Sequence, residues 1–294
     1  MMKKFKKIYV EITNQCNLTC AFCPRSQRPA QTMTVSFFTE ILQKIKKYTD
    51  YLCFHVMGEP LMHPELGAFL DISHEYGFKV NITTNGTLIK QIGPVIVSKP
   101  ALRQINISLH CFAGNSLGRI EDDYIDNVIA FAKGVLKGKK MIISLRLWNL
   151  PENGNVLDGS RILQKIGREF ECGAALADRS KVLDGIKLAD NIFLNGAIEF
   201  EWPGFDKQDR GTTGFCYGLR NQMAILVDGT VVPCCLDAQG ALALGNIGRM
   251  PLEDILQNPR ARSMYEGFSK RAVEEELCRK CGYRNRFDFM QKQR

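Results

Sequence analysis

Three cysteines near the amino terminus, Cys16, Cys20 and Cys23, stand at a C-x3-C-x2-C spacing. They directly follow an alternating run at residues 8–13 that is typical of a β-strand. Three soft thiolates on one short loop suit an iron–sulfur cluster, and three ligands leave one iron of a four-iron cluster open to another molecule. Zinc is the alternative, but it usually takes a fourth Cys or His nearby, and the nearest histidine is the distant His55. The spacing therefore favours an iron–sulfur site.

The composition is that of a globular protein. The chain has 294 residues, of which 45% are hydrophobic and 24% charged, enough for one large domain or for a domain and a smaller module. No apolar run approaches the ~20 residues of a membrane span, and the first seven residues lead into a strand without the apolar stretch of a signal peptide. We therefore expect a cytoplasmic enzyme without membrane contact. Eleven cysteines in a reducing compartment favour metal binding over disulfides.

The formal net charge of +8 comes from basic residues scattered along the chain. No recognisable nucleic-acid-binding motif accompanies them, so we do not expect a nucleic-acid substrate. An acidic peptide or a phosphorylated small molecule is more compatible with this charge.

Predicted strands alternate with predicted helices along the first two thirds of the chain. Strands are expected at 8–13, 52–57, 78–84, 102–109, 141–148 and 191–200. Ser36 is the expected N-cap of the first helix, and Gly77 is expected to end the second. Six such units predict parallel strands with right-handed crossovers, hence an α/β fold with a partial (β/α)6 TIM-like barrel. We place this barrel at residues 1–201.

A second cysteine set follows in a smaller carboxyl-terminal module at 202–294. A hairpin is expected around Asp228-Gly229, followed by a helix near 261–277. The thiols of this module are Cys216, Cys234, Cys235, Cys278 and Cys281. By ligand count alone, a structural zinc would explain them.

At the first cysteine motif the chain resembles the radical S-adenosylmethionine (radical SAM) superfamily. The resemblance implies that Cys16, Cys20 and Cys23 bind a [4Fe–4S] cluster whose fourth iron chelates S-adenosyl-L-methionine (SAM). It also implies reductive cleavage of SAM to a 5′-deoxyadenosyl radical that abstracts hydrogen from a substrate. Phe22 fills the aromatic position that lies beside the adenine in this family.

The same resemblance implies further SAM contacts at the ends of the predicted strands. They are Gly58, Glu59, Pro60, Asn85, Ser108 and His110. Glu59 is a suitable acceptor for the SAM ammonium, and the alternating spacing of Ser108 and His110 predicts that both lie on one face. From the residues alone, Gly58–Pro60 and Asn85-Gly86 are ordinary turns, and His110 is equally well a core histidine.

The second cysteine set is similar to the twitch module, a shortened SPASM domain with one auxiliary [4Fe–4S] cluster. This resemblance implies Cys216, Cys234, Cys278 and Cys281 as ligands, with Cys235 as the alternative to Cys234. If Cys235 is not a ligand, its thiol is a candidate hydrogen-atom donor. The layout is most similar to enzymes of the 2-deoxy-scyllo-inosamine dehydrogenase type.

Catalytic residues are less well marked. Arg146 and Glu199 at strand ends are candidates to bind a carboxylate or to transfer a proton, and rim salt bridges are the alternative. The turn-rich loop at 149–159 is either a lid or a connection. We expect oxidation of a small-molecule or short-peptide substrate, with an electron donor such as flavodoxin or ferredoxin. The alternatives are a radical SAM peptide epimerase or crosslink former, and a non-catalytic zinc-binding interaction protein.

Overall fold

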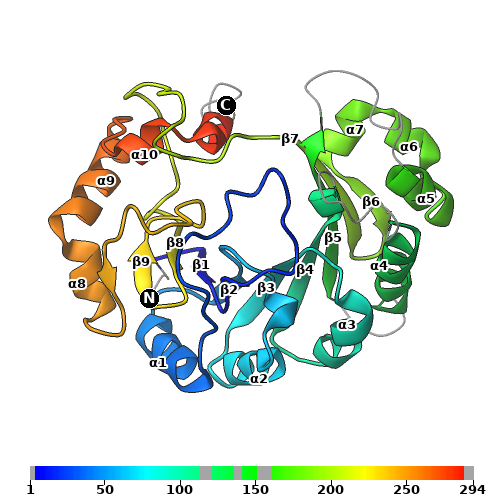
Figure 1. Ribbon diagram of the computed structural model, residues 1–294, viewed down its shortest axis with the longest axis horizontal. Coiled ribbons are helices and arrows are strands. Elements are labelled where there is room, and N and C mark those ends of the chain that lie inside the picture. The colour runs from blue at the N-terminus through cyan, green and yellow to red at the C-terminus, as the bar shows by residue number, and fades with distance from the viewer. Residues whose placement is uncertain (1–3, 113–120, 136–140, 151–160, 288–294) are drawn as a thin grey trace.

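The computed structural model describes residues 4–112, 121–135, 141–150 and 161–287. Strands and helices alternate along the chain and form a ring in Figure 1, with the loop that follows the first strand at its centre. Among the described residues, no helix combines the length and apolar character that a membrane crossing requires. The expected lid at 149–159 lies almost wholly outside the described residues.

Within the described residues, ten strands form one sheet in the order β10-β9-β8-β1-β2-β3-β4-β5-β7-β6. The strands are β1 (Lys7–Val10), β2 (Tyr51–Phe54), β3 (Lys79–Thr84), β4 (Leu102–Ser108), β5 (Ile142–Leu150), β6 (Ile186–Ala189), β7 (Ile192–Ile198), β8 (Gln222–Ile225), β9 (Thr230–Val232) and β10 (Gly245–Asn246). Pairing is parallel from β8 through β1 to β7 and antiparallel at both edges. The six predicted barrel strands are β1 to β5 and β7, so the predicted TIM-like class is confirmed.

The helices cover the outside of this sheet (Figure 1). They are α1 (Val35–Ile45), α2 (Leu66–Glu75), α3 (Ile89–Val97), α4 (Glu121–Val135), α5 (Arg161–Glu169), α6 (Gly173–Ala177), α7 (Arg179–Asp184), α8 (Leu252–Gln257), α9 (Pro259–Ser269) and α10 (Glu276–Arg279). Ser36 as N-cap was wrong, because the Thr34 side chain accepts the Phe37 N–H. The expected helix at 261–277 is divided into α9 and α10 at Arg271, whose φ of 59° is left-handed.

The carboxyl-terminal hairpin extends the barrel sheet. Strand β8 lies parallel to β1, with Lys7 opposite Gln222 and Val10 opposite Ile225. Several features were not foreseen, among them the short antiparallel strand β6 and the helix α3, which contains Pro94. The sheet runs across the expected boundary at residue 201, and the boundary itself remains a prediction.

Strand β1 has two different faces. Ile8 and Val10 pack into the core beneath the helices, whereas Tyr9 packs with Cys53 of β2 on the barrel interior. Because side chains alternate along a strand, Glu11 follows Tyr9 to the interior face. A carboxylate at such a position needs a partner.

That partner is Arg28, which lies beyond the first cysteine loop. Its Nη2 donates to both Glu11 carboxylate oxygens at 2.6 and 2.8 Å, and its Nε donates to the Ala238 carbonyl at 3.0 Å. The Met57 and Val227 N–H groups also donate to Glu11. Glu11 is fully buried, and burial raises its pKa although the Arg28 guanidinium opposes the shift. One carboxylate thus joins β1, the end of β2, the cysteine loop and the hairpin.

We predict that Arg28→Met lowers the free energy of unfolding by about 3–5 kcal/mol, since it leaves Glu11 buried without its counter-charge. Urea unfolding under anaerobic conditions measures the change. Lys99→Met is the control, because the partner of Lys99, Asp71, is half exposed and such pairs contribute about 0–1 kcal/mol. An equal decrease in the free energy of unfolding in the two variants would contradict the role of Arg28 as the counter-charge of buried Glu11.

Candidate active site

The first cysteine loop connects β1 to α1 and occupies the centre of the ring (Figure 1). Cys16 accepts the Leu18 N–H at 3.5 Å, and the Cys23 N–H donates to the Cys20 carbonyl at 3.1 Å. Burial raises the pKa of Cys16, and nearby Cys20 and Cys23 add to the rise because thiolates repel one another. A positively charged metal centre reverses this penalty and stabilises the thiolates, so the three donors fit an iron–sulfur cluster.

The turn at Gly58 supports the start of this loop. Gly58 has a φ of 76°, and a Cβ there would lie 2.4 Å from the Thr13 carbonyl oxygen. The Glu59 N–H donates to the Gln15 carbonyl at 2.8 Å, while Pro60 begins a short 3-10 turn. The glycine is required because the backbone immediately before Cys16 passes so close.

The Glu59 carboxylate is buried and hydrogen-bonded within the chain. It accepts from the Leu61 N–H at 2.9 Å, the Thr84 hydroxyl at 2.7 Å and the Asn85 N–H at 2.7 Å. Burial raises its pKa to about 7 despite these donors. Asn85 in turn points its Nδ2 at Cys16 Sγ, 3.8 Å away. Glu59 therefore braces Asn85 against the cysteine loop, and its contact with an ammonium remains a prediction.

Phe22 and His110 lie together beside the loop, with ring centroids 4.9 Å apart. His110 Nδ1 is 3.2 Å from the Arg146 carbonyl, and burial lowers the pKa of its imidazole. The expected alternation of Ser108 and His110 was wrong, because β4 ends at Ser108 and residues 109–112 form a 3-10 turn. His110 nevertheless faces the predicted adenine-stacking residue.

The two catalytic candidates differ in their surroundings. Arg146 on β5 is mostly buried, with its guanidinium 4.8 Å from the centroid of the Trp148 ring. Glu199 is exposed, one residue beyond β7. The neighbouring Glu201 forms an ion pair with Arg210 at 2.9 Å. At Glu201, therefore, the acidic side chain takes part in a salt bridge at the rim of the barrel.

The second cysteine set gathers around one largely apolar cavity. Its lining includes the four predicted ligands Cys216, Cys234, Cys278 and Cys281. Burial raises the pKa of each of these thiols, and neighbouring thiols raise it further for Cys216, Cys234 and Cys278. Among the described residues, no three His, Cys, Asp or Glu side chains converge on a single metal-ion position. Four soft sulfur donors around an apolar cavity suit a multi-iron cluster.

Consecutive residues Cys234 and Cys235 face different environments. Cys234 lines the cavity with the other three thiols, whereas Cys235 packs with Tyr9 and Cys53. Burial raises the pKa of the Cys235 thiol to about 11, although the nearby Tyr9 hydroxyl opposes the shift. The geometry favours Cys234 as the ligand and leaves Cys235 facing the barrel interior.

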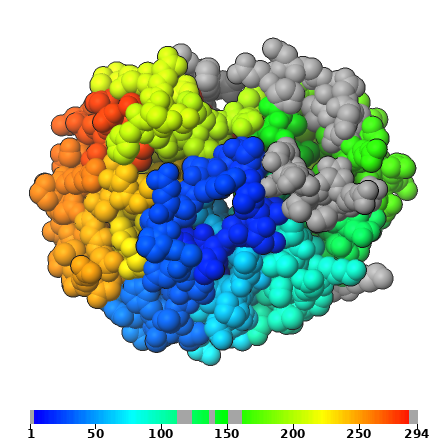
Figure 2. All heavy atoms as spheres, viewed as in Figure 1, coloured from blue at the N-terminus to red at the C-terminus, as the bar shows by residue number. Residues whose placement is uncertain are grey.

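Hydrogen bonds join the two cysteine-bearing segments directly. Besides the Arg28–Ala238 contact, Gln239 Nε2 donates to the Arg25 carbonyl at 2.6 Å, and its Oε1 accepts the Gln27 N–H at 3.0 Å. Figure 2 shows the loop in blue at the centre of this face, beneath the yellow-green segment that leads to the second set. Sequence reasoning missed these contacts; the available signal was a charged residue, Glu11, on the interior face of a strand.

Comparisons with known proteins agree with this geometry. The sequence profile of the Radical SAM superfamily matches residues 10–132, and that of the SPASM iron–sulfur cluster-binding domain matches residues 216–282. The chain thus carries a radical SAM domain followed by a SPASM domain. Its radical SAM domain implies a [4Fe–4S] cluster and SAM, and its SPASM domain implies additional iron–sulfur binding. With these two domains, the chain is a radical SAM enzyme.

One curated relative and several solved structures are similar to this chain over nearly its whole length. The SAM-dependent 2-deoxy-scyllo-inosamine dehydrogenase of Niallia circulans is 22% identical, over 96% of this chain and 94% of its own. The crystal structure of BtrN with AdoMet and 2-DOIA has a TM-score of 0.57 at 20% identity, over 96% and 94% of the two chains. Streptococcus suis SuiB bound to its precursor peptide SuiA has a TM-score of 0.59 at 17% identity, over 96% and 70%. At these identities the structural likeness shows the fold alone.

We predict that Gly58→Ala in this radical SAM enzyme lowers both thermal stability and iron bound at the first site. The added Cβ adopts a strained φ, which costs about 1–3 kcal/mol, and also meets the Thr13 carbonyl. Gly77→Ala is the matched control, with a φ of 79° and no atom within 4 Å of its Cβ. Melting temperature and iron per chain measure the effect; a loss no larger than that of Gly77→Ala would show that the close approach is unimportant.

We also predict that Cys234→Ser removes roughly four iron and four sulfide per chain, whereas Cys235→Ser retains them. The reason is that only Cys234 shares a cavity with the other three thiols. Iron and sulfide assays after anaerobic reconstitution measure this. The opposite pattern would make Cys235 the ligand.

Proposed function

We propose that this enzyme uses SAM to remove a hydrogen atom from a small-molecule or short-peptide substrate, and that it oxidises that substrate. Cys16, Cys20 and Cys23 would hold one [4Fe–4S] cluster, and Cys216, Cys234, Cys278 and Cys281 a second. When bound, the first cluster would supply the electron that cleaves SAM to a 5′-deoxyadenosyl radical. The second cluster would accept the electron that the substrate loses.

The observation that carries this proposal is the placement of the two thiol sets. The loop after β1 and the segment after β9 are joined by Arg28 and Gln239 at one side of the ring. A substrate between them reaches both sites without large motion of the chain. This fixed placement is what orientation of a reactive group requires.

The remaining predicted side chains would then bind SAM and shield the reaction. The Phe22 and His110 rings lie together at an angle of 45°, where adenine would contact them, and Asn85 lies next to Cys16. Phe200, Trp202 and Tyr283 form an aromatic cluster near the carboxyl-terminal segment, and apolar rings of this kind exclude water from a radical. The likeness to a SAM-dependent dehydrogenase supports net oxidation.

We place the reaction in the cytoplasm, with a flavodoxin or ferredoxin as the electron donor. Eleven cysteines, none joined in a disulfide among the described residues, are compatible with a reducing compartment.

A redox-neutral reaction on a peptide is the second candidate, because Cys235 faces the barrel interior beside Tyr9. A thiol there would return a hydrogen atom to the substrate. Solvent deuterium in the product, lost with Cys235→Ser, would identify this outcome; its absence together with an oxidised product would identify the dehydrogenase.

We predict that Cys16→Ala/Cys20→Ala/Cys23→Ala abolishes 5′-deoxyadenosine formation yet retains roughly four iron per chain. The physical reason is that the second thiol set shares no ligand with the first. Chromatography of SAM incubations with dithionite, together with iron and zinc analysis, measures both. SAM cleavage in this variant would overturn the proposal, and zinc in place of iron in the unmodified protein would favour the interaction protein.

A further inference from the structure

Two guanidinium groups from distant parts of the chain flank one indole ring. Arg146 of β5 lies 4.8 Å from the centroid of the Trp148 ring, and Arg286, after the last cysteine pair, lies 5.9 Å from the same centroid. Arg286 also lies over the rings of Phe200 and Tyr283 at 5.2 and 4.9 Å. The barrel and the carboxyl-terminal segment therefore each bring a positive charge close to the Trp148 ring.

Neither guanidinium has a carboxylate partner within the part of the chain that the structure describes. Other arginines do: Arg28, Arg210, Arg260 and Arg279 each pair with an acid. Arg286 donates to the Ile198 carbonyl, and the groups that act on Arg146 are Tyr and Cys side chains, chiefly Tyr9 and Cys53. Arg146 is mostly buried and Arg286 is partly buried, and a buried positive charge beside a second one is costly unless an anion accompanies them.

A third polar group at this place also lacks a partner. His55 Nδ1 is buried without a hydrogen bond, and its ring meets Tyr9 edge-on at 5.0 Å. Burial lowers the pKa of His55 to about 3, with Arg146 and Lys7 adding to the shift, so the imidazole is neutral and able to donate one hydrogen bond. An uncharged hydrogen-bond donor near Arg146 is a further candidate ligand for an anion.

We propose that Arg146 and Arg286, with His55, bind an oxyanion of the substrate, either a carboxylate or a phosphate. This inference rests on the proposed function, since it assigns the substrate class of that same site. Guanidinium groups suit it because their planar fork binds carboxylate and phosphate through two parallel hydrogen bonds. The same charges disfavour a cationic substrate.

The position matches a substrate between the two thiol sets. Arg146 pairs in register with Ser108 at the end of β4, next to the turn that carries His110. Arg286 follows Tyr283, which borders the cavity of the second thiol set. An anion held here anchors one end of a molecule whose other end faces the first cysteine loop.

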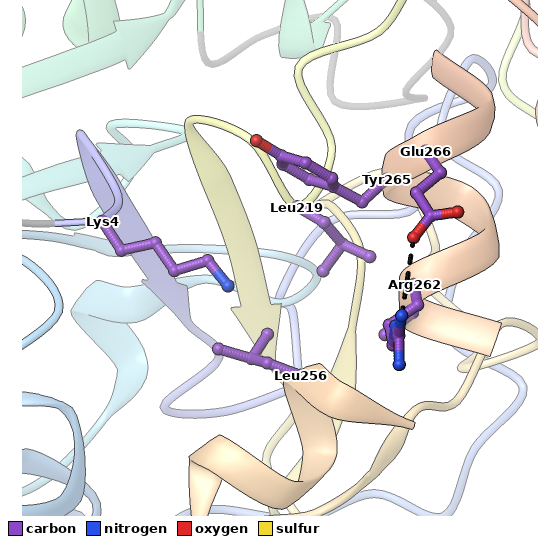
Figure 3. A pocket seen from close by; sticks show the side chains of 7 residues that line it. Lys4, Leu219, Leu256, Arg262, Tyr265 and Glu266 are labelled. Carbon is purple, nitrogen blue, oxygen red and sulfur yellow. Dashed lines mark ion pairs between the residues drawn. The ribbon is translucent and has the colours of Figure 1, made fainter. Parts of the chain in front are cut away.

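A basic groove elsewhere on the surface contains an arginine that does have a carboxylate partner. It is lined by Lys4, Leu256, Tyr265, Arg262 and Glu266 (Figure 3). There Arg262 already faces Glu266 at 3.8 Å, and both side chains are largely exposed. The charge of Arg262 is therefore compensated by Glu266, so Arg262 provides a control.

Equilibrium dialysis of the reconstituted full-length enzyme with radiolabelled inorganic phosphate, and separately with acetate, tests the proposal. We expect saturable binding of at least one anion that weakens about tenfold or more in Arg146→Gln and in Arg286→Gln, as for loss of a charge-assisted contact. Arg262→Gln should bind as the unmodified enzyme does. Stronger phosphate binding would indicate a phosphorylated substrate, and stronger acetate binding a carboxylate. Binding of neither anion, or equal binding in all four proteins, would overturn the proposal.

The carboxylate of SAM is the other possible source of an oxyanion, and a competition arm distinguishes it. If the site belongs to the substrate, saturating SAM leaves phosphate or acetate bound; displacement would assign the arginines to SAM and overturn the inference. Circular dichroism verifies that the variants fold, and Arg146→Lys should recover part of the affinity. Anion binding measured by dialysis does not depend on SAM cleavage. Absence of 5′-deoxyadenosine would therefore contradict the proposed function, whereas the anion-binding proposal is decided by dialysis alone.

Discussion

The buried carboxylate of Glu11 is the contact on which the arrangement of this enzyme depends. It receives hydrogen bonds from Arg28, Met57 and Val227, which come from the cysteine loop, the end of β2 and the hairpin. A buried carboxylate is tolerated only when its oxygens are satisfied, so these segments must stay together. The loop that carries the first thiols is thereby fixed against the sheet on one side and against the second thiol segment on the other.

A second brace acts at the start of the same loop. Glu59 fixes the ends of β2 and β3, while Gly58 lets the backbone before Cys16 pass within contact distance. A loop without regular hydrogen bonding is held in place by such side-chain contacts. Both braces use a carboxylate whose pKa is raised by burial, which ties the order of the loop to the packing of the barrel.

Groups of like charge lie near one another at two places in the protein. In the chain itself the thiols repel one another as thiolates, and Arg146 and Arg286 lie near one ring without an acid among the described residues. Metal clusters would relieve the first cost, and the anionic substrate that we propose would relieve the second. The folded chain thus has two unfavourable arrangements that its ligands stabilise, which is expected of a site built for binding.

The sequence by itself determined what depends on local spacing. The thiols at Cys16, Cys20 and Cys23, the strand alternation and the Asp228-Gly229 hairpin each follow from neighbours a few residues apart. Only the tertiary structure decided which long-range partners meet: Cys234 faces the cavity and Cys235 the barrel, Arg28 reaches Glu11, and Arg286 reaches Trp148. The reason is physical, because periodicity specifies the face of an element on which a side chain lies, whereas the group opposite that face is set by closure of the whole sheet.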